Sequence, residues 1–113
     1  MINIRGKNAF ITGSSRGIGQ QIALGLAKLG CHIIVHGRKH DSCIKTLKLI
    51  EPYDVNTYSV FGEISYEKQV SQIIKQVQEL NINVDILYNN AAIMTTYHED
   101  IWTHSEDEWL ETF

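Results

Sequence analysis

The sequence predicts an α/β fold, in which a doubly wound parallel sheet is built by 113 residues that form a single domain. The first observation is an alternation: short apolar or β-branched runs are followed by longer segments whose apolar residues recur at three and four positions. The second is the resulting order, β-α-β-α-β-α-β plus the start of a further helix. Parallel strands need a crossover, which a helix supplies, and right-handed crossovers place helices on both faces of the sheet.

The first half of the chain contains two of the strands and the first helix. Asn8–Thr12 is a short apolar run, and a helical pattern begins at Gly17. Gly30 stands where a glycine commonly ends a helix, and the β-branched run Cys31–Gly37 predicts the second strand. The apolar residues of the first helix are Ile18, Ile22, Leu26 and Leu29, with Ala23 and Ala27 beside them.

The second half continues the alternation. Asp41–Glu51 has helical spacing, and Pro52 prevents its continuation. Val55–Phe61 predicts a third strand, Ser65–Leu80 a third helix and Val84–Asn89 a fourth, buried strand. The apolar stripe of the third helix consists of Tyr66, Val70, Ile73, Ile74 and Val77.

Three glycines lie in the turn between the first strand and the first helix, in the sequence ITGSSRGIG. The start of a helix has unpaired N–H groups and a partial positive charge, so a phosphate is its natural ligand. Gly13 allows a tight turn, Gly17 lets the backbone approach a pyrophosphate, and Gly19 lets the helix pack closely on the strand. Ser14 and Ser15 add hydroxyl donors. The pattern therefore predicts a cradle for a dinucleotide diphosphate.

Two motifs resemble those of the short-chain dehydrogenase/reductase family. TGSSRGIG is similar to the family's cofactor motif, and NNAA (Asn89–Ala92) to its Asn-Asn-Ala-Gly, with Ala92 in place of the usual glycine. SEDEWLETF resembles the start of the helix that follows. The resemblance implies a Rossmann-type dinucleotide-binding domain over residues 1–113, truncated at its C-terminal side, and is nearest to 3-oxoacyl reductase-like members.

The end of the second strand favours NADP(H) over NAD(H). An NAD site carries an acidic residue there, but this chain has His36, Gly37, Arg38 and Lys39. The planar donor fork of Arg38 suits a 2′-phosphate, and Arg16 in the glycine turn is placed to reach the same group. The alternative is that both arginines are ordinary solvated surface residues.

Further site residues follow from the resemblance alone. It implies that Glu63, where the family usually has Asp, contacts the adenine amino group, that the Ile64 backbone contacts the base edge, and that Asn90 and Ala91 line the adenosine ribose. Asn89 and Thr12 are expected to tie strands together instead. The expected cofactor-binding residues are Gly13, Ser14, Ser15, Arg16, Gly17, Ile18, Gly19, Arg38, Glu63, Ile64, Asn90 and Ala91.

No catalytic or metal-binding residue is expected. In the family a tyrosine exchanges the proton of hydride transfer and a lysine four residues later lowers its pKa, but none of the five tyrosines here is followed by that lysine. His32, His36 and His40 recur every fourth residue, as on one helix face. Their β-branched surroundings predict a strand instead, so three ordinary polar residues are expected.

The composition argues against several partners. The net charge of −3 provides no basic excess for nucleic acid or anionic membranes, and no apolar run approaches the roughly 18 residues of a membrane span. Cys31 and Cys43 have no CxxC spacing and no export signal precedes them, which predicts buried or free thiols in a cytoplasmic protein. No oligomeric state is carried over, because the family generally associates through helices beyond this part.

The resulting hypothesis is the NADP(H)-binding N-terminal part of a short-chain dehydrogenase/reductase, whose complete form transfers hydride between NADP(H) and a carbonyl or hydroxyl substrate. The chain would be a fragment or the product of a shortened gene, because it stops about two turns into the helix that the capping box Ser105–Glu108 begins, with no C-cap. One alternative is a non-catalytic nucleotide-binding or interaction module that associates through an exposed fourth strand. Another is that a second chain supplies the missing half.

Overall fold

A computed structural model describes residues 3–64 and 67–90. Within these residues, parallel strands form one sheet in the order β3-β2-β1-β4. The predicted α/β class and element order are confirmed there, and the predicted start of a last helix lies outside the described residues. The elements are β1 (Asn8–Ile11), α1 (Gly17–Lys28), β2 (His32–Gly37), the 3₁₀ turn η1 (His40–Cys43), α2 (Ile44–Ile50), β3 (Thr57–Phe61), α3 (Glu67–Glu79) and β4 (Ile86–Tyr88).

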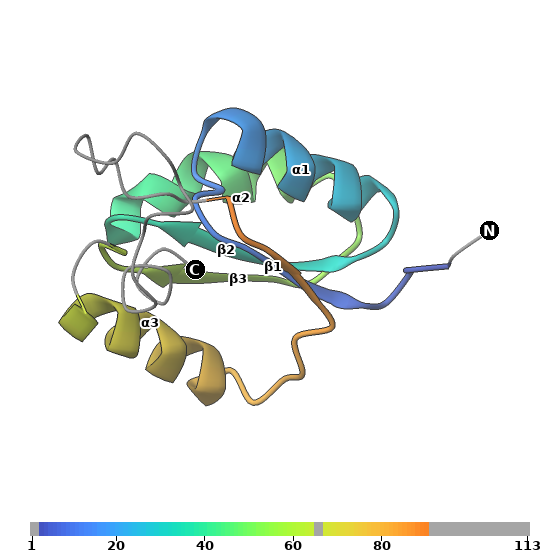
Figure 1. Ribbon diagram of the computed structural model, residues 1–113. Coiled ribbons are helices and arrows are strands. Elements are labelled where there is room, and N and C mark those ends of the chain that lie inside the picture. The colour runs from blue at the N-terminus through green and yellow to red at the C-terminus, as the bar shows by residue number, and fades with distance from the viewer. Residues whose placement is uncertain (1–2, 65–66, 91–113) are drawn as a thin grey trace, which may run out of the picture.

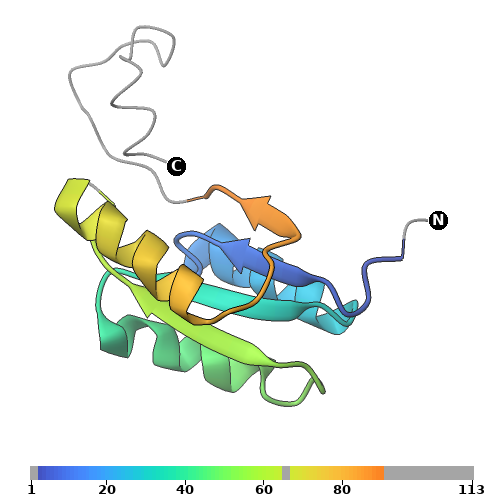
Figure 2. The same ribbon diagram turned by 90° about the horizontal axis from the view of Figure 1, so that it is seen from below.

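The helices form a layer on each face of the sheet: α1 and α2 cover one face and α3 the other (Figures 1 and 2). Successive strand residues point to opposite faces, so the central strands β1 and β2 contribute to both cores. Under α1 and α2 the core contains Ala9, Ile11, Ala23, Ala27, Cys31, Ile33, Val35, Cys43 and Ile50. Under α3 it contains Phe10, Ile34, Val60, Ile64 and Ile73.

Two helices end at residues with a left-handed backbone. After α1, Gly30 has φ +93°, its N–H donates to the Ala27 carbonyl, and the Cys31 N–H donates to the Leu26 carbonyl. This pair of hydrogen bonds is a Schellman motif and confirms the predicted glycine cap. Asn81, with φ +56°, follows α3 in the same way. Both caps turn the chain back toward the amino edge of the sheet.

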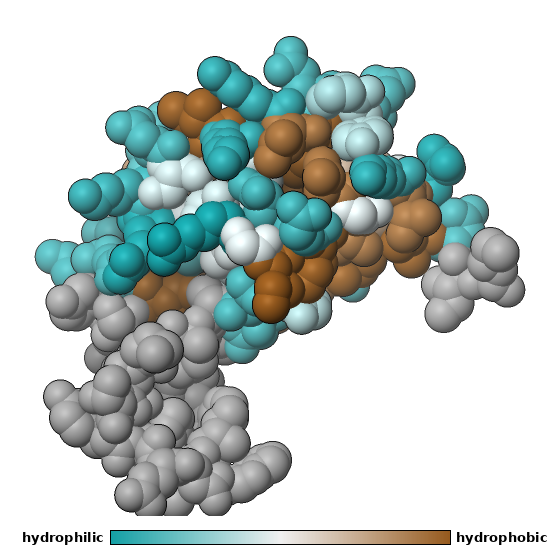
Figure 3. All heavy atoms as spheres, turned by 90° about the horizontal axis from the view of Figure 1, so that it is seen from above, coloured by the Kyte–Doolittle hydropathy of each residue, from teal (hydrophilic) through white to brown (hydrophobic). Residues whose placement is uncertain are grey.

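The buried faces of the helices differ from the predicted apolar stripes. Ala23 and Ala27 are buried, whereas Ile18 is 70% exposed and Leu29 58% exposed. Small residues face the sheet because they let the helix axis lie close to it, and the larger residues lie to one side of that face. On α3, Ile73 is buried but Ile74 is 42% exposed. Seen from the side of α1 and α2, the surface consequently carries apolar as well as polar side chains (Figure 3).

The fourth strand is shorter than Val84–Asn89 and is not buried, so that prediction is wrong. Ile86 packs partly on the core under α1 and α2, but Leu87 and Tyr88 are 49% and 42% exposed. β4 ends the strand order, and among the described strands it pairs with β1 alone. A strand with one hydrogen-bonded neighbour has less of its surface covered than the central strands β1 and β2.

Both cysteines are buried free thiols, as predicted. Burial raises the pKa of each thiol, because the low-dielectric interior disfavours a thiolate. Among the described residues, no helix is long and apolar enough to cross a membrane. Over the same ranges, no cluster of three or more His, Cys, Asp or Glu side chains is arranged to hold a metal ion.

Candidate functional site

The candidate site lies at the carboxyl edge of the sheet, around the loop between β1 and α1. Because the strands are parallel, the ends of β1, β2 and β3 and the segments that follow them meet at this edge. The chain moves from β1 to β2 and β3 on one side, and β4 lies on the other side of β1. Such a reversal of strand order marks the crevice in which open α/β sheets bind ligands.

The three predicted glycines have the conformations that their positions require. Gly13 and Gly17 have φ of +64° and +61°, in the left-handed region that side chains disfavour. A Cβ at Gly17 would meet no atom within 4 Å, so open space lies before this backbone. A Cβ at Gly19 would lie 2.3 Å from the Gly13 carbonyl oxygen and 2.7 Å from Nδ2 of Asn90. Gly19 therefore lets the helix lie directly against the loop.

Side chains from α1, from α2 and from the segment after β4 bind successive carbonyls of this loop. Asn90 Nδ2 donates to the Gly13 carbonyl at 3.2 Å. Thr46 Oγ1 donates to the Ser14 carbonyl at 2.8 Å, and Gln20 Nε2 donates to the Ser15 carbonyl at 3.1 Å and to Thr46 Oγ1 at 3.0 Å. Thr46 and Gln20 are buried, so these carbonyls are held toward the protein interior.

The N–H groups of residues 15–18, in contrast to the carbonyls of the loop, are left without acceptors among the described residues. The N-cap residue Arg16 makes no side-chain capping bond. The first turn of α1 contains no acidic residue. A row of unpaired N–H groups at the positive end of a helix is suited to bind an anion. The loop therefore has the donors, the backbone conformation and the open space for phosphate.

The Ser14 hydroxyl was expected to be a donor to the diphosphate, but it has other partners in the structure. Its Oγ donates to the Ile11 carbonyl at 2.8 Å and accepts from the His36 N–H at 3.0 Å, and the residue is fully buried. The hydroxyl therefore ties the loop to β1 and β2 and does not face the open side. Ser15, in contrast, lines the pocket described below.

His36 was not among the predicted site residues, but it contacts the loop directly. Its side chain is buried at the end of β2, Nδ1 accepts the Gly13 N–H at 2.8 Å, and Nε2 lies 3.0 Å from the Gly62 carbonyl. Burial lowers the pKa of His36 from its ordinary value of 6.5, opposed by the Gly62 carbonyl and the Glu63 carboxylate. The imidazole is therefore neutral at pH 7, with the proton on Nε2.

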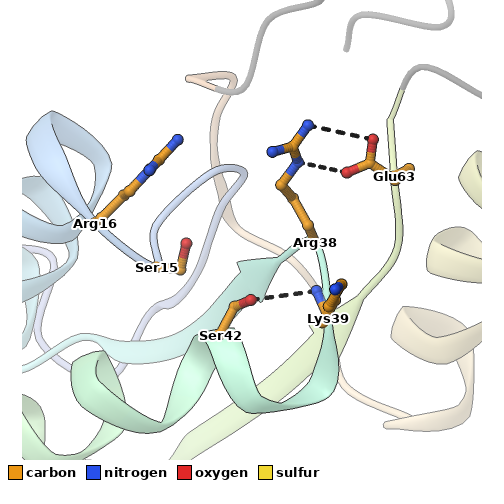
Figure 4. Close-up of a pocket in the computed structure, with 6 residues that line it drawn as sticks. All are labelled: Ser15, Arg16, Arg38, Lys39, Ser42 and Glu63. Atoms are coloured by element: carbon orange, nitrogen blue, oxygen red, sulfur yellow. Dashed lines mark hydrogen bonds and ion pairs between the residues drawn. The ribbon is translucent and has the colours of Figure 1, made fainter.

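A pocket of about 420 Å³ adjoins the loop at the end of β2 (Figure 4). Arg16 comes from the start of α1 and Arg38 from the end of β2, and Arg38 Nε and Nη2 donate to the Glu63 carboxylate. The Arg38 side chain is 70% exposed, so solvent weakens this ion pair strongly. The lining residues are Ser15, Arg16, Arg38, Lys39, Ser42 and Glu63.

The remaining predicted residues lie around the same edge. The Thr12 hydroxyl contacts Asn89 Oδ1 at 3.3 Å and accepts the Asn90 N–H at 3.0 Å, which confirms that Thr12 and Asn89 tie β1 to β4. The Ile64 side chain belongs to the core under α3. Ile18 is exposed at the start of α1, and Ala91 lies outside the described residues.

Replacing Thr46 with valine tests the support of the loop. Valine keeps the shape but leaves the Ser14 carbonyl without its donor, so we expect the free energy of unfolding to fall by about 1–3 kcal/mol. Thr46→Ser is the control, because it keeps the hydroxyl and loses one methyl group, worth about 0.8 kcal/mol. Urea denaturation measures both. A valine variant as stable as the serine variant would contradict a supporting role for this hydroxyl.

Comparison with known proteins places these features in context. The family model of short chain dehydrogenases matches residues 7–113. L-rhamnose 1-dehydrogenase (NADP(+)) of Thermoplasma acidophilum is 39% identical over 94 residues, which are 82% of this chain and 37% of that protein.

Two solved structures are similar in fold. L-sorbose reductase of Gluconobacter frateurii, in complex with NADPH and L-sorbose, has a TM-score of 0.74 and 34% identity, over 96% of this chain and 41% of that one. A 3-oxoacyl (acyl-carrier-protein) reductase of Agrobacterium tumefaciens with NADP bound has a TM-score of 0.75 and 30% identity, over 97% and 42%. The chain thus spans about two-fifths of the length of the proteins it matches.

Proposed function

The chain belongs to the short-chain dehydrogenase family, and from this membership we propose that it binds NADP(H) as the N-terminal, cofactor-binding part of an oxidoreductase. The observation that carries the proposal is the row of unpaired N–H groups at residues 15–18, beside a pocket that contains two arginines. The N–H groups bind the diphosphate, and Arg16 and Arg38 bind the 2′-phosphate.

The remaining contacts are proposed from the family's pattern. Glu63 and the Ile64 backbone contact the adenine, and Asn90 and Ala91 line the adenosine ribose. Hydride transfer to a carbonyl is proposed only for a protein that also carries the family's Tyr-x-x-x-Lys motif. These 113 residues do not contain that motif. The related rhamnose dehydrogenase, sorbose reductase and 3-oxoacyl reductase act on chemically different substrates by name, so the substrate class is left open.

Titration of the 113-residue chain with NADP⁺ and NAD⁺ by isothermal calorimetry tests the proposal. We expect NADP⁺ to bind at least about tenfold more tightly, because a hydrogen bond to a charged group is worth about 1.5–3 kcal/mol. Equal affinities would contradict the role of the arginines. No binding of either dinucleotide would refute the function as a whole.

Glu63 is expected to compete with the cofactor for Arg38. In the structure its carboxylate accepts from Arg38, and a bound 2′-phosphate needs the same guanidinium. Glu63→Gln removes the competing charge, and exposed ion pairs are worth about 0.2–1 kcal/mol. We therefore expect NADP⁺ to bind up to about fivefold more tightly and NAD⁺ to be affected less.

The matched control is Glu51→Gln, at the exposed end of α2, which changes the net charge by the same amount. It should leave both affinities unchanged in calorimetry. If Glu63→Gln weakens NADP⁺ and NAD⁺ alike, the proposed contact of Glu63 with the adenine, which both cofactors share, accounts for the whole effect, and the competition is refuted.

A further inference from the structure

We propose that His36 is a positioning residue for the cofactor: its neutral imidazole bridges Gly13 and Gly62 and so holds the β1–α1 loop in the conformation that binds the diphosphate. This inference rests on the proposed function and deepens it. His36 itself lies behind the loop, is 3% exposed, and does not line the pocket of the two arginines. Its effect on the ligand is therefore indirect, through the backbone of the loop.

The hydrogen bonds fix both the ring and the loop. Nδ1 accepts the Gly13 N–H at 2.8 Å, so Nδ1 carries the lone pair and Nε2 carries the proton that faces the Gly62 carbonyl at 3.0 Å. The backbone adds two contacts between the same segments: the Ser14 N–H donates to the His36 carbonyl, and the His36 N–H donates to the Ser14 hydroxyl. Only the neutral Nε2–H tautomer satisfies both ring contacts.

This bridge acts at the point where the loop needs a left-handed backbone conformation. Gly13, whose N–H the imidazole accepts, has φ +64°, and the unpaired N–H groups begin two residues later. Without an acceptor at Nδ1, the part-buried Gly13 N–H would turn toward another partner and move the row of N–H groups with it. The imidazole therefore determines where the diphosphate donors point.

The surroundings of the ring determine its response to pH. The carboxylate that faces it is Glu63, from the segment after β3, while its partners on the β1–α1 loop and its β3 neighbour Val60 are uncharged. Burial outweighs these favourable contacts and lowers the pKa below 6.5. The folded protein therefore binds this proton less readily than the unfolded chain. The bridge is intact above pH 6.5, and both stability and affinity fall as the pH decreases below it.

The experiment compares His36→Asn and His36→Leu in the 113-residue chain. The Asn Oδ1 takes the place of Nδ1 and keeps the acceptor for Gly13, whereas leucine removes both contacts. We expect the leucine variant to bind NADP⁺ and NAD⁺ about tenfold more weakly, by the same factor for both, and the asparagine variant to recover affinity to within about threefold of the wild type.

Two controls separate positioning from general stability. His32→Asn alters the half-buried histidine at the other end of β2, which accepts the Asn56 N–H away from the loop, and should leave both affinities unchanged. Binding of 2′-AMP, which lacks the diphosphate, should also change by less than about twofold in the leucine variant. Equal losses for 2′-AMP and NADP⁺, or no loss for NADP⁺, would overturn the proposal.

Nuclear magnetic resonance gives a readout that needs no ligand. The ¹⁵N shifts of the His36 ring should show a neutral Nε2–H tautomer, and the Gly13 amide resonance should titrate together with the ring below pH 6.5. A proton on Nδ1 at pH 7 would overturn the inference even if the leucine variant does not fold. If the wild type binds no NADP⁺ at all, the proposed function fails and the positioning role fails with it. If the wild type binds NADP⁺ and the His36 variants bind it with the same affinity, only the positioning role fails.

Discussion

Gly19→Ala should weaken the binding of both dinucleotides by up to about 100-fold, and it is one of the two changes for which we expect the largest effects. The new Cβ would lie 2.3 Å from the Gly13 carbonyl oxygen and 2.9 Å from the Gly13 carbonyl carbon. These are backbone atoms of the loop that carries the N–H row, so the loop must move away from α1. Overpacking of this kind costs about 1–3 kcal/mol, and a loss of about 3 kcal/mol corresponds to about 100-fold in affinity.

The same helix provides the control. A Cβ at Gly25 would meet nothing within 4 Å, so Gly25→Ala should keep the affinity and raise stability by about 0.5–1 kcal/mol, since glycine is unfavourable inside a helix. Urea denaturation and calorimetry with NADP⁺ measure both effects. If Gly19→Ala behaves like Gly25→Ala, the close contact between helix and loop does not determine the shape of the site.

Arg38→Asp should weaken NADP⁺ by about 100-fold and change NAD⁺ by less than about threefold. The substitution removes a charge-assisted contact to the 2′-phosphate and places a second carboxylate beside Glu63. NAD⁺ has a hydroxyl at that position, so it loses no ionic contact. The fold should be little affected, because the ion pair it breaks is exposed and worth at most about 1 kcal/mol.

Lys75→Asp, on the exposed side of α3, is the charge-matched control, because α3 covers the opposite face of the sheet from α1 and α2 (Figure 1). It should leave the ratio of the two dissociation constants unchanged in parallel titrations. An equal loss of NADP⁺ and NAD⁺ in Arg38→Asp would count against contact with the 2′-phosphate and would indicate a general effect on the pocket.

Local features of the fold were predictable because they depend on neighbouring residues in the sequence. Gly30 ends α1 as expected, since a left-handed residue is needed there and glycine adopts it at no steric cost. The glycine turn was predictable for the same reason. The exposure of Leu87 and Tyr88 was not, because it depends on how many strands flank β4 and not on the residues of β4.

The supporting contacts of the site were also not predictable, because they join segments far apart in the sequence. Thr46 binds a carbonyl 32 positions earlier, and Gln20 binds Thr46 across two helices. The sequence did contain a signal for their burial, because each is a polar residue among core positions. Gln20 lies on the same helix face as Ala23 and Ala27. Thr46 lies on the same face as Cys43 and Ile50. Such residues are buried only when they find partners, but the sequence does not name the partner.

The binding of three successive loop carbonyls by Asn90, Thr46 and Gln20 has a thermodynamic consequence. The conformational entropy of ordering this segment is lost when the chain folds, so a ligand that arrives later encounters a rigid, preorganised surface and loses less freedom on association. Association should consequently be close to lock-and-key, with a heat capacity change that reflects burial of the ligand alone and no coupled folding of the loop.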